Sequence, residues 1–265
     1  MTLINQATMD NPKKLTTKQA TIINLLHRFR FLKSTQIQIL LNDKTTHLTN
    51  DCLKTLTLRN YLGRRYTRIL GEGNQPAIYY LAKKSLKALE LNPNIEKTKL
   101  AYIYREKTRS KQFISRALFI ADYYLFLANE SEINTLKLHF FTKTDLQPHP
   151  YMIQPLPDAY FARIDPDGVT KRDFLEVIDE GMPRFALKKR VRQYNDYLES
   201  GEFEKTTNHP FPTILFICPN VGTKAYLKKY LIKTSEEASL DTVSLYLATR
   251  TEAFAGAWEK VEVEE

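Results

Sequence analysis

Residues 45–65 read TTHLTNDCLKTLTLRNYLGRR, and within this stretch the spacing of the apolar residues changes from helical to strand-like. Up to residue 60, apolar side chains recur at three- and four-residue intervals, which predicts a helix from Thr45 or Thr46 to about Asn60. The predicted buried face of that helix consists of Leu48, Cys52, Leu53 and Leu56. After Leu62 and Gly63 the period becomes two, so we expect the helix to lead directly into a β-hairpin.

The residues before and after this stretch extend the pattern. A helix is predicted from near Thr17, followed by a short connection through residues 31–33 and a second helix capped by Ser34. The hairpin strands are predicted at residues 64–70 and 77–81, joined by the glycine-rich turn at 71–76, and a last helix at 82–89. Three helices, a hairpin and a helix in this order are typical of a winged helix-turn-helix, a fold that docks on duplex DNA.

Candidate DNA-binding residues lie on the third helix and on the hairpin. On the helix they are short polar side chains and one cation, of the kind that reach base edges and phosphates in the major groove: Thr46, His47, Thr49, Asn50 and Lys54. On the first hairpin strand they are Arg64, Arg65 and Arg68, which we expect to meet the phosphate backbone or the minor groove. The alternative is a winged helix that binds another protein and no nucleic acid.

The distribution of charge favours the first interpretation. Residues 1–130 contain 22 Lys and Arg against 9 Asp and Glu, whereas residues 131–265 contain 17 against 21. Lys and Arg side chains that neutralise phosphates supply most of the non-specific affinity for DNA. A basic first half joined to a mildly acidic second half therefore indicates a DNA-binding module fused to a different domain, although a solvated basic surface without a partner gives the same counts.

Other residues limit the class of protein. The two cysteines, Cys52 and Cys218, are far apart in apolar stretches, which indicates buried thiols in a reducing compartment and no disulfide framework or zinc site. No run of apolar residues is long enough to span a membrane, and the first 15 residues do not resemble a secretion signal. No glycine-rich phosphate loop precedes a Lys-Ser or Lys-Thr pair, which argues against nucleotide hydrolysis. We therefore expect a cytoplasmic protein.

The second half has the pattern of a layered α/β domain. An apolar helical face at residues 113–127 precedes predicted strands at 136–140, 151–163 and 172–179. A helix at 185–198, a wholly apolar strand at 213–218, a helix at 223–233 and a strand at 243–249 follow. This order is αβββαβ with one further αβ unit, and the apolar strand predicts a central position in a sheet covered on both faces. The expected domains are residues 1–91, a linking helix at 92–112, and residues 113–265.

Two carboxylates in this domain are placed as in a nuclease. Asp158 follows Pro157 in the predicted strand at 151–163, and Glu176 lies in the predicted strand at 172–179. This part of the chain therefore resembles the PD-(D/E)XK nuclease core. In that core, paired carboxylates hold Mg²⁺ or Mn²⁺ to activate water, and a lysine two residues further on stabilises the developing charge. The lysine position is Ile178 here. Strand alternation puts Glu176 on one face of the sheet and Asp179, a reserve ligand, on the other.

A cation from the following helix is the expected replacement for the missing lysine. Lys188, Lys189 and Arg192 are the candidates, and Lys189 is the one chosen here as the catalytic cation beside Asp158 and Glu176. The alternative is that a helix with several bases is only a solvated face.

Taken over nearly its full length, the chain resembles the replication-relaxation family of plasmids and mobile elements. The resemblance is carried by residues 15–89, by Leu156-Pro157-Asp158-Ala159-Tyr160-Phe161, by residues 174–181, by Lys189 with Tyr194 and Tyr197, by the strand ending at Cys218, and by Trp258. It implies a winged helix joined to a degenerate, restriction-endonuclease-like α/β domain, and a role in plasmid replication or DNA relaxation. One departure is that two residues separate Glu176 from Asp179, where the family pattern has one spacer.

Three functions follow from these observations. The leading one is a non-catalytic factor that binds double-stranded DNA, needs no cofactor, and uses its second domain to form a homodimer or to bind replication or transfer proteins. The second is a metal-dependent nuclease or nickase that uses Asp158 and Glu176, with Asp179 as a further metal ligand. The third is a transcriptional repressor with the same winged helix.

Overall fold

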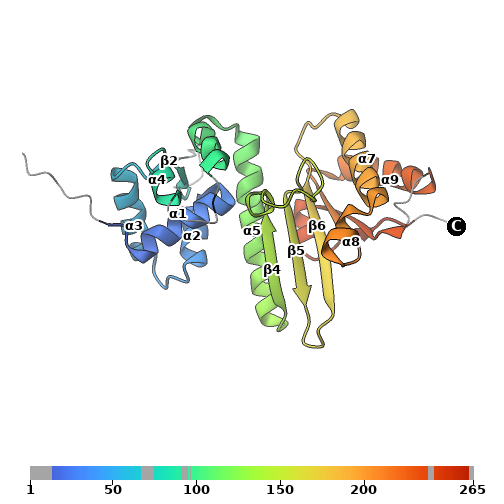
Figure 1. The fold of residues 1–265 in the computed structure, drawn as a ribbon, viewed down its shortest axis with the longest axis horizontal. Helices are drawn as coiled ribbons and strands as arrows, with labels where there is room; N and C mark the ends of the chain where they lie inside the picture. Colours follow the sequence, from blue (N-terminus) through green and yellow to red (C-terminus); the bar gives the residue numbers. More distant parts are fainter. Residues whose placement is uncertain (1–13, 67–74, 91–94, 96, 238–241, 263–265) are drawn as a thin grey trace, which may run out of the picture.

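A computed structural model describes residues 14–66, 75–90, 95, 97–237 and 242–262. The long helix α5 (Lys111–Ile133) stands between an N-terminal unit and a second unit that is built on a large sheet (Figure 1). Among the helices of the described ranges, none is long and apolar enough to cross a membrane. The result is a mixed α/β protein.

The N-terminal unit consists of four helices and a small antiparallel sheet. In chain order its elements are α1 (Thr17–Phe29), β1 (Phe31–Lys33), α2 (Ser34–Leu40), α3 (Thr46–Leu58), β2 (Leu62–Arg65), β3 (Ile78–Leu81) and α4 (Ser85–Leu89). The strand order is β1-β3-β2. The helices and the hairpin strands occur in the predicted order. Part of the expected hairpin, residues 67–74 with Arg68, lies outside the described residues.

Local signals explain where α1 begins and ends. The Thr16 side chain accepts a hydrogen bond from the Gln19 backbone N–H, and the Gln19 side chain accepts one from the Thr16 N–H. This reciprocal pair satisfies two N–H groups that the first turn leaves free. The helix ends where Arg30 takes a positive φ of 72°. Ile22, Leu26 and other residues of its apolar stripe are buried.

Two predictions about the start of α2 need correction. The expected connection at residues 31–33 is strand β1, because its backbone pairs with β3 and Phe31 lies opposite Tyr80. Ser34 is the first residue of α2 and does not cap it. The Gln36 side chain accepts the Lys33 backbone N–H at 2.7 Å instead.

The buried face of α3 is rotated from the predicted one. Leu53 and Leu56 are buried as expected, but the Leu48 side chain is 58% exposed. Thr49 takes its place in the interior with 1% exposure, and its hydroxyl donates to the Asp43 carboxylate. The hydrogen bond to Asp43 lets this short polar side chain be buried, because a buried hydroxyl needs a partner.

The linking segment is not the single long helix that the sequence predicts. A 3₁₀ helix, η1 (Lys97–Thr108), precedes α5, and the two are separate because Ser110 begins a new helix. Its hydroxyl accepts the Phe113 backbone N–H at 3.2 Å. Leu100 and Ile103 of η1 pack into the core of the N-terminal unit, so the segment is part of that unit's interior.

The second unit contains a six-stranded mixed sheet with the order β4-β5-β6-β7-β8-β9. Its elements after α5 are β4 (Lys137–Thr142), α6 (Lys143–Leu146), β5 (Ala159–Ile164), β6 (Thr170–Val177), α7 (Arg184–Ser200), α8 (Glu202–Thr207), β7 (Thr213–Cys218), α9 (Val221–Glu237), β8 (Leu245–Thr249), α10 (Arg250–Phe254) and β9 (Glu259–Lys260). Strand β7 is parallel to β6 and β8, which confirms its predicted central place.

One predicted strand is too long by eight residues. Residues 151–158 form turns, and β5 begins at Ala159. Pro155 and Pro157 have no N–H to donate to a ladder, which disfavours a strand here. Met152 and Ile153 are instead buried beneath α7, and the Tyr197 hydroxyl donates to the Tyr151 carbonyl at 2.9 Å.

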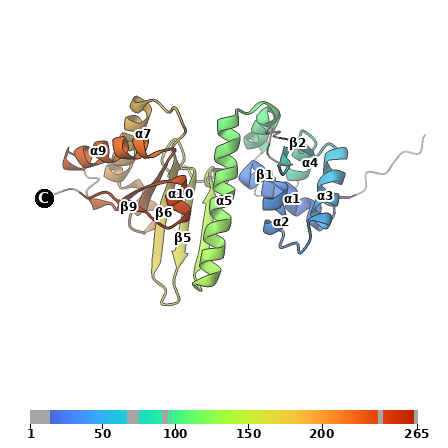
Figure 2. The ribbon, with the colours of Figure 1, turned by 180° about the vertical axis from the view of Figure 1, so that it is seen from behind.

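Helices cover both faces of the sheet. The face with Phe174 and Phe216 packs against α7, α8 and α9, and the face with Leu175 and Leu215 packs against α5 and α10. Figure 2 shows α5 and α10 on the second face. Alternate residues of β6 and β7 are therefore buried in two different cores, which accounts for their continuous apolar sequences.

Gly63 provides a stability test for the N-terminal sheet. A Cβ at this position would lie 2.3 Å from Cζ of Tyr80, on the neighbouring strand. We expect Gly63→Ala to lower the free energy of unfolding by about 1–3 kcal/mol, because the ring of Tyr80 must move. Thermal or urea unfolding measures this change.

The matched control is Gly222→Ala in α9. There a new Cβ meets no atom closer than 3.5 Å, and alanine is the better helix former. This variant should be as stable as the wild type or slightly more so; equal destabilisation of both variants would contradict the expected clash with Tyr80.

Candidate functional site

The first candidate surface is the exposed side of α3. Four of the predicted DNA-binding residues, Thr46, His47, Asn50 and Lys54, are exposed there. The spacing of His47, Asn50 and Lys54 places them within one side of the helix, whereas Thr46, seven residues before Leu53, is exposed because it begins the helix. Thr49 does not belong to this surface because it is buried with Asp43. The surface is therefore largely polar and carries one lysine, but it also exposes two large apolar side chains, Leu48 and Leu58.

The two described arginines of the hairpin behave differently. Arg64 is exposed on β2, with its guanidinium 5.3 Å from the ring centre of Tyr66. Arg65 donates to the backbone carbonyls of Lys107 at 2.6 Å and Arg109 at 3.3 Å. Arg65 thus holds η1 against the hairpin, a role that nothing in the local sequence indicates. Arg68 lies outside the described residues.

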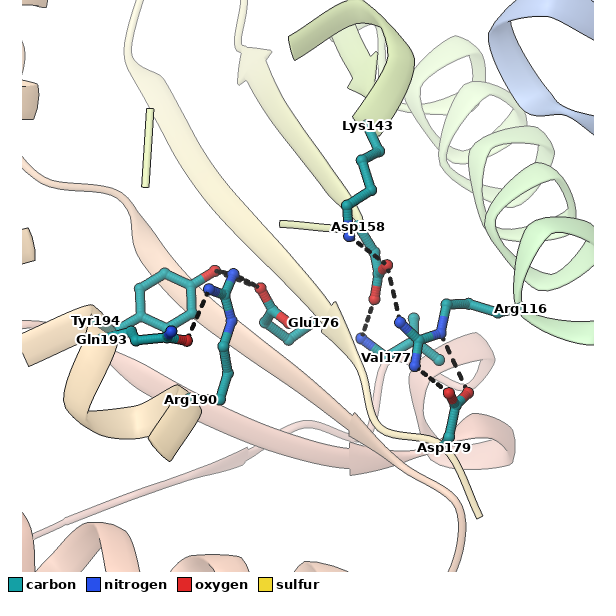
Figure 3. Close-up of polar contacts among 9 residues, drawn as sticks. All are labelled: Arg116, Lys143, Asp158, Glu176, Val177, Asp179, Arg190, Gln193 and Tyr194. Carbon is teal, nitrogen blue, oxygen red and sulfur yellow. Dashed lines mark hydrogen bonds and ion pairs between the residues drawn. The ribbon is translucent and has the colours of Figure 1, made fainter. Parts of the chain in front are cut away.

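The second candidate site is a group of carboxylates at the carboxyl end of β6 (Figure 3). Asp158 lies directly before β5 and is 6% exposed. One of its oxygens, Oδ2, accepts the Val177 backbone N–H at 2.9 Å. The other, Oδ1, lies 3.4 Å from Nη1 of Arg116 and 3.9 Å from Nζ of Lys143. The side chain of Asp158 therefore connects the start of β5 to strand β6 and to helix α5.

Glu176 points to the opposite face of the sheet, toward α7. The Tyr194 hydroxyl donates to its Oε1 at 2.7 Å, and the Arg190 guanidinium forms an ion pair with the same oxygen. Burial raises the pKa of the Glu176 carboxyl, while the charge of Arg190 opposes that shift and that of Asp158 adds to it. The carboxylates of Asp158 and Glu176 are thus electrostatically coupled.

Asp179 forms a third ion pair in the same region. The Arg116 guanidinium donates to both of its oxygens, with Nε 3.1 Å from Oδ1. Because Arg116 also faces Asp158, one guanidinium bridges the two aspartates (Figure 3). As strand alternation predicted, Asp179 lies on the α5 side of the sheet and Glu176 on the α7 side.

The cation beside Glu176 is a residue that the sequence analysis did not select. Lys189 and Arg192 are exposed, and Lys188 lies with its ammonium 5.2 Å from the ring centre of Tyr230. Lys189, the predicted catalytic cation, lies on the solvent side of α7, so the structure does not bring it to Glu176. Arg190 follows Leu187 by three residues and precedes Tyr194 by four, so the buried stripe of α7 was the available signal.

These carboxylates do not fit a divalent cation as they are arranged. A hard cation requires carboxylate oxygens that converge and are not already neutralised. Here Oε1 of Glu176 and both oxygens of Asp179 meet guanidinium groups. The oxygens of Asp158 meet a backbone N–H and Arg116. In the described part of the chain, no group of three His, Cys, Asp or Glu side chains is placed to hold a metal ion.

Comparison with known proteins places this chain in a family. The replication-relaxation family model matches residues 23–214, which is more than half of the chain. The chain belongs to the replication-relaxation family. The matched region runs from α1 into β7, so it includes both α3 and the carboxylates at the end of β6.

Other comparisons add little to the family match. No curated protein matches the chain. Among solved structures, the restriction endonuclease FokI is similar with 13% sequence identity and a TM-score of 0.31, over 91% of this chain and 44% of the endonuclease. The chain thus spans less than half of the length of that enzyme, and a similarity this weak supports no argument about mechanism.

The buried pair of Arg190 and Glu176 gives a prediction about stability. Removing one partner of a buried ion pair leaves an uncompensated charge, so Arg190→Met should destabilise the protein by about 3–5 kcal/mol near neutral pH. Without Arg190, the pKa of Glu176 in the folded state rises further above that in the unfolded state. The folded state then binds more protons, so the destabilisation should be smaller near pH 5 than near pH 8.

Urea unfolding of Arg190→Met and wild type at several pH values measures this difference. Arg192→Met is the control, since Arg192 is exposed on the same helix. A destabilisation that does not depend on pH would show that Glu176 is not the group left unpaired.

Proposed function

We propose that this replication-relaxation protein binds double-stranded DNA through its N-terminal unit, and that it acts in plasmid or mobile-element replication without cutting DNA itself. The observation that supports the binding is the exposed polar side of α3 beside Arg64 of β2. The order α1, β1, α2, α3 and the β2–β3 hairpin matches that expected of a winged helix, in which the third helix enters the major groove.

The contacts within the N-terminal unit support this orientation of α3. Its buried side is held by Leu53, Leu56 and the Thr49–Asp43 hydrogen bond, and Asp43 also pairs with Lys18 of α1. On the opposite side Asn50 and Lys54 are exposed, so their polar groups are accessible to a DNA groove.

His47 is a further exposed polar group at the start of α3. Its ring nitrogen Nδ1 lies 3.1 Å from the Asp51 carboxylate on the next turn of the helix. Together with Asn50 and Lys54, it gives the helix a polar surface suited to base edges and phosphates.

A second observation supports the absence of cleavage. Arg116 pairs with Asp158 and with Asp179, and Arg190 pairs with Oε1 of Glu176. The carboxylates that a nuclease would use to hold its metal ion are thus already paired with guanidinium groups. In this arrangement the carboxylates have a structural role: Asp158 and Asp179 pair with Arg116 of α5, and Glu176 of β6 pairs with Arg190 of α7.

Salt-dependent binding tests the first part of the proposal. Fluorescence anisotropy with a labelled duplex should show an affinity that falls steeply with salt concentration. The double variant Lys54→Ala/Arg64→Ala should weaken binding and lower the slope of log affinity against log salt by about two, one unit for each phosphate that is no longer neutralised.

Lys229→Ala in α9 is the matched control, because it removes an exposed lysine far from α3 in the sequence. It should leave both the affinity and the salt slope unchanged. Equal effects of the two sets of substitutions would mean that general charge, and not the α3 surface, attracts the DNA.

A plasmid relaxation assay tests the second part. Purified protein with Mg²⁺ or Mn²⁺ should leave a supercoiled plasmid intact, and EDTA should make no difference. Nicking that depends on the metal and disappears in Asp158→Ala and Glu176→Ala would instead establish the nuclease function. A gel-shift experiment with the same plasmid shows whether the protein used in the relaxation assay binds DNA.

A further inference from the structure

A cavity of about 560 Å³ lies on the α5 and α10 face of the large sheet. It is situated at the amino end of β6, whereas Asp158 and Asp179 are at the carboxyl end of that strand. Figure 2 shows the face concerned, on which both α5 and α10 lie. The residues that matter here are Phe126, Arg163, Lys171, Asp173, Tyr246 and Trp258.

Aromatic side chains line the apolar part of the cavity. Phe126 comes from α5, Tyr246 from β8, and Trp258 from the segment that joins α10 to β9. All three are only partly buried, so their rings contribute to the cavity surface. Partly exposed aromatic rings from three different elements offer stacking faces to a planar ring.

Polar and charged side chains line the rest of the cavity, among them Glu130 and an ion pair between Arg163 and Asp173. Asp173 is 5% exposed, and Nη2 of Arg163 donates to its Oδ2 at 3.2 Å. Nε of Arg163 is buried with no hydrogen-bond partner in the described part of the chain. A buried donor without an acceptor is uncommon in folded proteins, and a ligand or solvent oxygen is the usual partner. Lys171, two residues before Asp173, is exposed at the edge of the cavity.

We propose that this cavity binds a nucleotide whose base carries an exocyclic amino group. The aromatic rings supply stacking, the Asp173 carboxylate accepts a hydrogen bond from the amino group, and Arg163 and Lys171 attract the phosphate. The volume lies within the range of about 300–1,000 Å³ that is usual for small-molecule sites. Cytosine, adenine and guanine carry the amino group, whereas uracil and thymine do not.

The nucleotide has two sources, a free mononucleotide or an unpaired nucleotide of a DNA strand. Both present the same base, sugar and phosphate to the cavity. Stacking on aromatic side chains combined with cations is the usual way in which proteins hold unpaired bases. This site is on the second unit, so the proposal does not depend on duplex binding by α3.

Trp258 is the single tryptophan of the chain, and it lines the cavity, so its fluorescence reports on this site. The full-length protein is titrated with CMP, UMP and ribose 5-phosphate, and separately with a short oligodeoxycytidine strand. We expect saturable quenching by CMP, at least about tenfold weaker binding of UMP, and no quenching by ribose 5-phosphate. Quenching by the strand alone, if Asp173→Asn abolishes it, assigns the same site to an unpaired nucleotide of DNA.

Two variants keep the test decisive if one of them folds poorly. Asp173→Asn should weaken CMP binding about tenfold or more, and Lys171→Ala, which changes an exposed side chain, should weaken it about threefold to tenfold. Asp167→Asn, on the exposed turn between β5 and β6, is the control and should bind CMP as the wild type does. Circular dichroism verifies that each variant is folded.

Several outcomes would overturn the nucleotide site. These are no saturable change with any nucleotide or strand, equal affinity for CMP and UMP, or unchanged binding in both Asp173→Asn and Lys171→Ala. Quenching by a polyglutamate peptide as strong as that by CMP would assign the cavity to acidic chains instead. Duplex affinity, measured in parallel, separates the two proposals: it should fall in Lys54→Ala/Arg64→Ala and remain unchanged in Asp173→Asn.

Discussion

The structure depends on one helix that must be apolar on several sides. Ile114 and Leu118 of α5 pack with Phe31 and Tyr80 of the N-terminal unit, while Phe119 and Tyr123 pack on the large sheet. A helix with apolar side chains on more than one side must bury each of those sides against other elements. Residues of α5 belong to both cores. Removing either unit would therefore expose apolar side chains of α5 that are buried in the complete protein.

Polar contacts fix the N-terminal unit to this interior. The Gln36 amide of α2 donates to the Leu118 carbonyl at 3.0 Å and to Asp122 at 2.7 Å, both on α5. Arg28 of α1 forms an ion pair with Asp145 of α6 at 2.8 Å. Further along, Arg116 joins α5 to Asp158 and Asp179 of the sheet. The exposed side of α3 and the carboxylates of β6 are therefore held in one connected framework.

The sequence predicted elements better than it predicted side-chain partners. The apolar run at Thr213–Cys218 identified the central strand because periodicity depends only on local spacing. Asp158 and Glu176 were located correctly, but their partners Arg116 and Arg190 were not, since an ion pair between distant elements leaves no local pattern. Thr49 and Leu48 exchanged their expected places because the choice of a buried side depends on the rest of the unit.

A helix shared by two cores leaves no hinge between them. Many proteins connect two domains by a flexible linker, which lets each domain move independently. In this protein the Gln36 amide of the N-terminal unit donates to the Leu118 carbonyl and the Asp122 carboxylate of α5, and the same helix packs on the sheet. A partner that binds the sheet and fixes its orientation would consequently also fix the orientation of α3.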